Sequence, residues 1–286
     1  MAFENLRGVL KHAADARSSV CLALAEGFSS RASARPAAGF LLRRLSAHDR
    51  IDFRYRQHGR VLSAALRMAA LESDLLGFYE VVVYDCYRVP SWFHPLTVID
   101  GGANVGFFTL SAATRWPGAK VIAVEPLPEN AALIERNLAA NGLNAEIVRA
   151  ALSAKAGTAQ FYIRDPNVGS LYLEDRAFSD NIEVALVRLS DIYGTTTGVP
   201  CLLKLDIEGS EVEVLEEFLA KPRGECVFVG ELHRWPETHA RFEGVLSRAG
   251  FRVEYYNRDR VCVLFTAYRT ESGDIGRKQA NSRMLP

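Results

Sequence analysis

Acidic residues and one histidine stand where several short apolar runs of this chain end. They are Asp100, Glu125, Asp206, Glu208, Glu231 and His233. The runs before them have the length and apolar character of strands, and in an open α/β sheet ligands bind outside the carboxyl ends of the strands. These side chains should therefore face one crevice. Carboxylates there can hold a substrate or act as a base, and a histidine at the same edge is a candidate general base.

A glycine-rich turn follows the first of these acids. Residues 100–106 read Asp-Gly-Gly-Ala-Asn-Val-Gly, between the strand-like Thr97–Ile99 and a helical pattern from Phe107 to Ala113. Glycine permits a positive φ and the close approach of a ligand, and Asn104 is the non-glycine residue that best tolerates the same backbone region. The helix that follows directs unpaired N–H groups and a positive dipole end toward the turn. The segment therefore predicts a nucleotide-like ligand.

The charge of Asp100 indicates which nucleotide the turn binds. A carboxylate a few ångströms away repels the pyrophosphate of a dinucleotide, but it attracts S-adenosylmethionine, which carries an ammonium and a sulfonium group and no phosphate. The order of Gly102, Asn104 and Gly106 departs from the dinucleotide fingerprint G-x-G-x-x-G, although residues 101–106 match it loosely. S-adenosylmethionine is the favoured cofactor, and an NAD(P)-dependent oxidoreductase is the alternative.

Two further segments extend the predicted cofactor site. Glu125 lies about twenty residues beyond the turn, where a carboxylate would accept hydrogen bonds from both ribose hydroxyls; an ordinary strand-end acid is the alternative. Ala151 leaves the next predicted strand, where adenine often packs. The candidate cofactor-binding residues are Asp100, Gly101, Gly102, Ala103, Asn104, Gly106, Glu125, Pro126, Ala151 and Asp206.

The candidate catalytic residues come from the later strand ends. Residues 201–205 form an apolar run interrupted only by Lys204, which is as readily explained as a structural ion pair with one of the acids. Glu231 and His233 fall on the same side of their strand by alternation. We rank His233 first and Asp206 second as the proton acceptor, with Glu208 and Glu231 beside them. No metal-ligand spacing is present, so no metal site is predicted, although the converging carboxylates leave metal assistance open.

Composition excludes several classes of partner. The 34 basic and 34 acidic residues give no net charge, so neither nucleic acid nor an acidic membrane surface is expected. The five cysteines have no C-x-x-C spacing and are expected to be buried thiols in a reducing compartment. No apolar segment is long enough to span a membrane, and no signal-peptide pattern opens the chain. We expect a cytoplasmic protein that acts on a small molecule, and its homo-oligomeric state stays open.

The elements that must position these residues form an α/β pattern. Apolar periodicity predicts a hairpin over residues 51–62 and a helix over residues 71–87. Strands follow at residues 97–100, 120–125, 145–153, 201–205 and 226–233, with helices between them. Residues 158–189 are too long for a plain connection and are predicted to form hairpins beside the main sheet. Residues 251–267 are predicted to form a closing hairpin.

Four of these segments together resemble the FkbM family of S-adenosylmethionine-dependent methyltransferases. They are Asp100–Gly106, Glu125–Pro128 (Glu-Pro-Leu-Pro), Lys204–Glu211 (Lys-Leu-Asp-Ile-Glu-Gly-Ser-Glu) and Glu231–His233. The resemblance implies a class I, Rossmann-like methyltransferase fold, which is an α/β three-layer sandwich around a mostly parallel seven-stranded sheet with an antiparallel C-terminal hairpin. It also implies methylation of a hydroxyl group on a sugar, a polyketide or another small metabolite.

The resemblance also assigns roles by position. The turn residues would line the methionine part of the cofactor, Glu125 would hold the ribose, and the later acids with His233 would face the acceptor. Gly101 stands where the family pattern leads us to expect an apolar residue, which should loosen the turn.

The same resemblance divides the chain. We expect an N-terminal helical arm (1–50), a methyltransferase domain (51–270) and a polar tail (271–286). Within the domain, residues 51–96 form a hairpin and a helix before the cofactor-binding core (97–270). A non-catalytic scaffold that binds S-adenosylmethionine is the remaining alternative, and the intact acids at the strand ends argue against it.

Overall fold

The computed structural model describes residues 8, 10–30, 41, 49–165, 168–171, 180–194, 198–257 and 262–269, without the side chains of residues 26–30, 164, 165, 168 and 169. The predicted polar tail (271–286) and part of the predicted arm therefore lie outside the described residues. So does part of the turn in the predicted closing hairpin.

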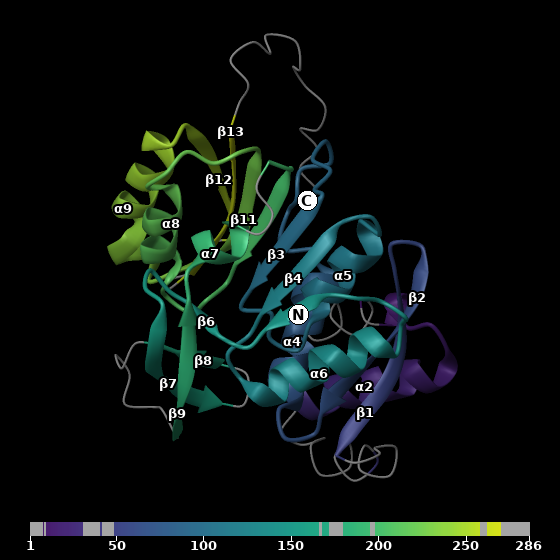
Figure 1. Ribbon diagram of the computed structural model, residues 1–286. Coiled ribbons are helices and arrows are strands. Elements are labelled where there is room, and N and C mark those ends of the chain that lie inside the picture. The colour runs from purple at the N-terminus through teal and green to yellow at the C-terminus, as the bar shows by residue number, and fades with distance from the viewer. Residues whose placement is uncertain are drawn as a thin grey trace.

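A seven-stranded sheet runs through the centre of the protein (Figure 1). In spatial order its strands are β12 (Phe251–Tyr256), β13 (Cys262–Arg269), β11 (Cys226–His233), β10 (Cys201–Leu205), β3 (Thr97–Gly101), β4 (Lys120–Val124) and β5 (Glu146–Val148). Among these described strands, β13 alone runs in the direction opposite to the other six. The mostly parallel sheet with an antiparallel C-terminal hairpin, as expected for a class I methyltransferase, is confirmed.

Helices cover both faces of this sheet, which makes the three-layer sandwich. One face carries α4 (Leu71–Phe78), α5 (Phe107–Arg115) and α6 (Pro128–Ala139), and the other carries α7 (Leu189–Gly194), α8 (Glu211–Leu219) and α9 (Trp235–Arg248). The central strand β10 is buried along its whole length because its sequence is apolar on both sides. Leu202 packs with the first group of helices, and Leu203 with the second.

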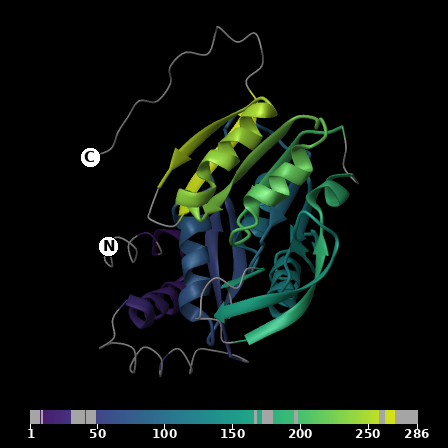
Figure 2. The ribbon, with the colours of Figure 1, turned by 90° about the vertical axis from the view of Figure 1, so that its left-hand side faces the viewer.

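The predicted hairpin and an N-terminal helix pack on the first face. β1 (Arg50–Gln57) and β2 (Arg60–Arg67) pair in antiparallel register around Gly59, which has a φ of +74°. α2 (Ala16–Ser30), purple in Figure 2, contacts β1 and α4. Its Cys21 and Leu22 lie in the same apolar cluster as Tyr55 of β1. None of the helices in the described part of the chain is long and apolar enough to cross a membrane.

A second, four-stranded sheet lies beside the main one, at the lower left of Figure 1. Its order is β6 (Ala151–Leu152), β9 (Asp180–Val187), β7 (Gly157–Asp165) and β8 (Val168–Ser170). Of the hairpins predicted for residues 158–189, the described residues show the antiparallel pair β7–β8, whereas β9 pairs with β7 and not with its chain neighbour β8. The single strand predicted over residues 145–153 is wrong, because the chain turns at Ala150 and continues as β6, which pairs with β9 and not with the main sheet.

The helix predicted over residues 71–87 is shorter in the structure than predicted, and it changes from an α-helix to a π-helix. α4 ends at Phe78 and continues as one π-helical turn, η1 (Tyr79–Val83). In that turn the N–H of Tyr84 donates to the oxygen of Tyr79, five residues back. The segment after it is irregular and brings Tyr87 to the carboxyl edge of the main sheet.

All five cysteines are free thiols. Cys21, Cys86, Cys201 and Cys226 are buried, as expected from their apolar surroundings, whereas Cys262 is partly exposed. Burial raises the pKa of the Cys226 thiol to about 11, so that group stays protonated at neutral pH.

Candidate active site

The glycine-rich turn between β3 and α5 has the backbone that its sequence predicts. Gly102, Asn104 and Gly106 have φ values of +70°, +51° and +89°. A Cβ at Gly102 would lie 1.9 Å from the backbone oxygen of Asp206, so the turn packs directly on the end of β10. Gly101 has no positive φ, and a Cβ there would lie 2.5 Å from a methyl carbon of Leu152. Gly101 therefore permits close packing, which corrects the expectation that it loosens the turn.

Asp100 lies in the protein interior below this turn. Its side chain is fully buried; Oδ2 accepts a hydrogen bond from Thr109 Oγ1 at 2.6 Å, and Oδ1 lies 3.3 Å from Lys204 Nζ. Lys204 also faces Asp206 Oδ2 at 3.8 Å and donates to the oxygen of Gly102 at 2.5 Å. The structural ion pair considered for Lys204 is therefore present.

This ion pair changes the electrostatics predicted from the sequence. Burial alone would lower the pKa of Lys204, but the carboxylates of Asp100 and Asp206 outweigh burial and raise the pKa above its ordinary value. Lys204 is therefore positively charged at neutral pH and compensates Asp100 within the interior. The attraction between Asp100 and a cationic cofactor is weakened by this ammonium group.

Glu125 is buried at the end of β4, where hydrogen bonds hold its carboxylate. Oε2 accepts from the N–H of Asn104 at 2.8 Å, and Oε1 accepts from the N–H of Leu127 and the amide of Asn130, each at 3.0 Å. Burial raises the pKa of Glu125 to about 7, and these hydrogen bonds limit the rise. Each carboxylate oxygen can accept two hydrogen bonds, so Oε2 retains one position for a ligand.

A pocket opens at the carboxyl ends of β3, β4 and β10. Its lining combines apolar side chains with a few carboxylate and amide groups, as small-molecule sites do. The predicted cofactor-binding residues that line it are Gly102, Asn104, Glu125, Pro126, Ala151 and Asp206. The others, which are Asp100, Gly101, Ala103 and Gly106, support the turn from behind and are not among the lining residues.

The second sheet forms the opposite wall of this pocket. Phe161 of β7 and Leu171, just after β8, line it together with Leu127, which follows β4. Ser170 Oγ donates a hydrogen bond to the backbone oxygen of Glu208 at 2.9 Å and so joins the second sheet to the end of β10. Sequence reasoning assigned none of these apolar residues, because β7 and β8 carry no motif that places them at the site.

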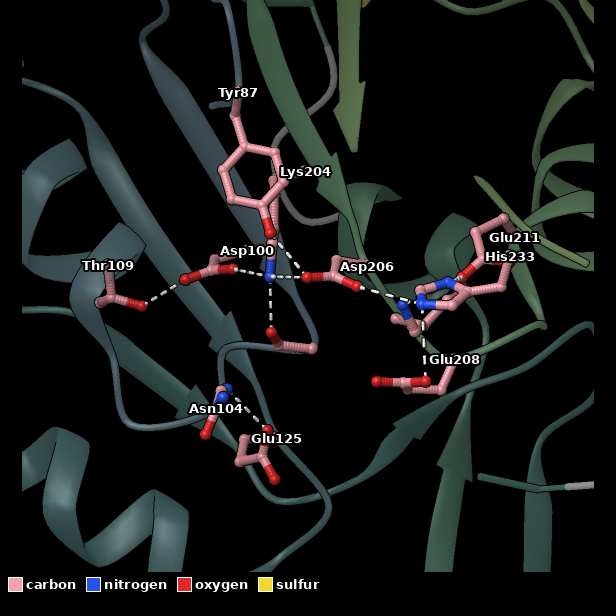
Figure 3. A network of polar contacts seen from close by, with 12 residues as sticks. Tyr87, Asp100, Asn104, Thr109, Glu125, Lys204, Asp206, Glu208, Glu211 and His233 are labelled. Carbon is pink, nitrogen blue, oxygen red and sulfur yellow. Dashed lines mark hydrogen bonds and ion pairs between the residues drawn. The ribbon is translucent and has the colours of Figure 1, made fainter. Parts of the chain in front are cut away.

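Beside the pocket, three of the predicted catalytic residues converge (Figure 3). His233 Nε2 lies 3.4 Å from Glu208 Oε2 and 3.9 Å from Asp206 Oδ1. On the other side of the ring, Nδ1 lies 3.0 Å from Glu211 Oε1. Glu231 and His233 are both partly exposed, whereas the residue between them is buried, which confirms the predicted alternation along β11.

Carboxylates outnumber cations in this cluster and determine which groups hold protons. Burial alone would lower the pKa of His233, yet the carboxylates around it, with Glu211 foremost, hold the pKa well above its usual range. His233 therefore retains its proton at neutral pH, which argues against its first rank as a general base. Burial raises the pKa of Glu208 to about 7. Burial and the charge of Asp206 also raise the pKa of Glu231.

Three further residues belong to the cluster although the sequence assigned them no role. The hydroxyl of Tyr87 donates to Asp206 Oδ2 at 2.6 Å, across 119 residues of chain. Burial, together with the charge of Asp206, raises the pKa of Glu80 to about 8. Glu211 is 1% exposed and contacts His233. Glu211 could have been found as a further acid of the Lys204–Glu211 motif, whereas no local spacing connects Tyr87 or Glu80 to Asp206.

The same region matches a family of known proteins. Residues 100–253, which are more than half of the chain, match the methyltransferase FkbM domain. The chain belongs to this family. The chain therefore carries a methyltransferase domain of this family, and the resemblance seen in its sequence motifs is confirmed.

Three relatives of this FkbM-family protein are methyltransferases by name. Methyltransferase sdnD of Sordaria araneosa is 27% identical over 237 residues, which cover 66% of this chain and 90% of the relative. Methyltransferase 1 of Beauveria bassiana is 27% identical over 158 residues, which cover 48% and 64%. The 31-O-demethyl-FK506 methyltransferase FkbM of Streptomyces tacrolimicus is 29% identical over 150 residues, which cover 41% and 57%. The chain thus spans less than two thirds of the last two relatives.

Proposed function

We propose that this protein transfers a methyl group from S-adenosylmethionine to a hydroxyl group of a small molecule, such as a sugar or a polyketide. The observation that carries the proposal is the continuity between the pocket and the cluster of acids around the histidine. Asp206 and Glu208 line the pocket and also face His233. A cofactor in the pocket and an acceptor beside His233 would therefore meet at these two acids.

The residues that line the pocket suit this cofactor. Asn104 Oδ1 is buried without a hydrogen-bond partner in the described part of the chain, so a ligand donor would satisfy it. Glu125 retains acceptor capacity for the ribose hydroxyls. Leu127, Phe161 and Leu171 offer apolar surface for an adenine ring. The cofactor supplies a methyl group on a sulfonium, which reacts with a nucleophile.

The positive charge of the cofactor requires a carboxylate that reaches the pocket. The Asp206 side chain is 21% exposed and lines the pocket, whereas that of Asp100 is fully buried. We assign the direct electrostatic attraction to Asp206. Asp100 would act indirectly, because it holds Lys204, which in turn bonds the backbone of the turn at Gly102.

Methyl transfer to an alcohol is an in-line displacement, in which the protein aligns the reactants and takes up the hydroxyl proton. Glu208 suits this role best, because burial raises its pKa to about 7 and its side chain reaches the pocket. Asp206 is the second candidate. The positive charge of His233 would stabilise the ionised forms of Asp206 and Glu208. Glu231 would lie on the acceptor side of the same strand end.

An oxygen acceptor is favoured by two observations. An alcohol is a poor nucleophile that needs a base at the reacting oxygen, and carboxylates converge at the position where that base would lie. In addition, one relative is named a 31-O-demethyl-FK506 methyltransferase.

A labelled-methyl assay tests the proposal. The protein is incubated with S-adenosylmethionine carrying a carbon-13 methyl group and with a panel of hydroxylated sugars and polyketides, and the products are analysed by mass and NMR. We expect the label on oxygen. Glu208→Gln should lower kcat by about 100-fold or more, whereas Glu237→Gln, at an exposed position of α9, should not. Label on nitrogen or carbon, or NAD(P)-linked oxidation of the acceptor, would refute the assignment.

A further inference from the structure

Three side chains next to the pocket have the composition and spacing of a metal site. Asp206, Glu208 and His233 each offer one ligand atom, and these atoms lie within 4.8 Å of one another. They come from the carboxyl ends of β10 and β11, which are neighbouring parallel strands. Two carboxylate oxygens and an imidazole nitrogen form a mixed set that suits first-row divalent cations such as Mn²⁺, Fe²⁺ or Zn²⁺.

The distances within this set fit ligands around an ion better than a hydrogen-bonded cluster. His233 Nε2 lies 3.4 Å from Glu208 Oε2 and 3.9 Å from Asp206 Oδ1. Both distances exceed the range of about 2.7–3.2 Å for an N–H···O hydrogen bond. Two ligand atoms that each lie about 2.1 Å from an ion, at a tetrahedral angle, are about 3.4 Å apart. The three groups can therefore reach one ion with small side-chain rotations.

A buried carboxylate orients the imidazole for coordination. Glu211, which is 1% exposed, contacts His233 Nδ1 at 3.0 Å, so Nε2 points to the two acids. Metal-binding histidines almost always donate their other ring N–H to such a partner. Glu211 Oε1 also accepts the N–H groups of Ile207 and Gly209, each at 3.1 Å. One carboxylate thus fixes both the histidine and the loop that carries Glu208.

Asp206 presents one of its oxygens to the same point. Its Oδ2 accepts the Tyr87 hydroxyl at 2.6 Å and faces Lys204 Nζ at 3.8 Å. Its Oδ1 is the oxygen that faces His233 Nε2. Tyr87 and Lys204 therefore hold the carboxylate so that Oδ1 is directed to the other two groups, as Figure 3 shows.

We propose that Asp206, Glu208 and His233 bind one first-row divalent cation at the acceptor side of the pocket, and that the cation replaces the proton on His233 Nε2, which passes to solvent. Its role in turnover rests on the function proposed above: the acceptor hydroxyl would bind the cation, which makes its proton easier to lose. The O–H proton then passes to solvent while the new O–CH₃ bond forms and the S–CH₃ bond breaks, which leaves S-adenosylhomocysteine. Glu208 would coordinate the cation in this case and would not accept the proton.

Titration of Mn²⁺ into the EDTA-treated and dialysed full chain, followed by electron paramagnetic resonance, tests the site. We expect one ion per chain and, in the unmodified protein, a spin-echo modulation from an imidazole nitrogen. Glu211→Gln should weaken Mn²⁺ binding by about 10- to 100-fold, and Asp206→Asn or His233→Gln by more than that. Glu237→Gln should bind Mn²⁺ as the unmodified protein does.

Absence of the nitrogen modulation in the unmodified protein would overturn the proposal, and this outcome needs no variant to fold. Unchanged Mn²⁺ affinity in a natively folded His233→Gln variant would do the same. Binding of S-adenosylhomocysteine to the metal-free protein is measured separately. Failure of that binding alone would reject the methyl-transfer role and leave the cation site standing.

Discussion

At the scale of single residues, Lys204 provides the positive charge that balances the buried acids of the site. Its side chain is 4% exposed and faces the carboxylates of Asp100 and Asp206. The acid at position 100 is predictable from its place before a glycine-rich turn. Its burial is not, because its partner belongs to β10, a strand that only folding brings beside β3. The sequence therefore identifies the charged residues of the site better than it identifies which of them line the pocket.

Asp100→Ala tests the buried ion pair. The substitution leaves Lys204 buried with only the more distant Asp206, so the free energy of unfolding should fall by about 3–5 kcal/mol in urea denaturation. Asp191→Ala is the matched control, because it removes the partner of Arg188 in an exposed pair and should leave the unfolding free energy near that of the unmodified protein. Equal losses in the two variants would show that Asp100 and Lys204 are not a buried pair.

Glu125 should make the affinity for the cofactor depend on pH. Burial raises its pKa to about 7, so the carboxyl is mostly protonated below that pH and ionised above it. In the proposed site the ribose hydroxyls would donate to the ionised form, so affinity for S-adenosylhomocysteine should rise with pH through about 7 and then level off. Calorimetric titrations on both sides of this pH measure the effect. Glu125→Gln should bind more weakly and without this dependence; an affinity that falls as the pH rises would contradict the role of Glu125.

At the scale of secondary-structure elements, the sequence predicts those elements that have a strong local pattern. It does not predict those whose form depends on contacts with residues far away in the chain. The hairpin around Gly59, the glycine-rich turn and the buried run of β10 each have a periodicity or a glycine that specifies them. The division of residues 145–153 between two sheets depends on β9, which is distant in the chain. The π-helical turn after Phe78 has no comparable sequence signal.

Gly102→Ala tests the turn as an element. Alanine there must adopt a φ of +70°, and its Cβ would lie 1.9 Å from the oxygen of Asp206. The backbone strain alone costs about 1–3 kcal/mol, and displacement of the turn should also abolish binding of S-adenosylhomocysteine. Gly118→Ala is the control, since that position has open space and no positive φ. A Gly102→Ala protein with normal melting and normal binding would contradict the packing of the turn on β10.

At the scale of the whole molecule, α2 and the hairpin share one apolar core with the sheet. Leu22 of α2 and Tyr55 of β1 lie in the same cluster as Phe78 and Phe107. The rings of Tyr55 and Phe78 are 5.3 Å apart, and those of Phe78 and Phe107 are 5.5 Å apart. Periodicity predicted the helices and strands that carry these rings but not their convergence. We expect α2, the hairpin and the sheet to unfold in one transition.

Substitutions of Tyr55 test this shared core. Tyr55 is fully buried, and its hydroxyl has no hydrogen-bond partner among the described residues. Tyr55→Phe removes an unsatisfied polar group, so the free energy of unfolding should rise by about 1 kcal/mol. Tyr55→Ala should lower it by about 3–5 kcal/mol, because it leaves a large cavity. Urea denaturation followed by circular dichroism measures both. A phenylalanine variant as unstable as the alanine variant, or two separate transitions, would contradict the shared core.

In the proposed function, the pocket between Glu125 and Asp206 holds the adenosyl cofactor of a methyltransferase. Calorimetric titration with S-adenosylhomocysteine, with NAD⁺ as the comparison ligand, tests it most directly. We predict saturable binding of one S-adenosylhomocysteine per chain, loss of that binding in Asp206→Ala, and no binding of NAD⁺. Binding of NAD⁺ without binding of S-adenosylhomocysteine, or full affinity in the Asp206→Ala variant, would contradict this placement of the cofactor.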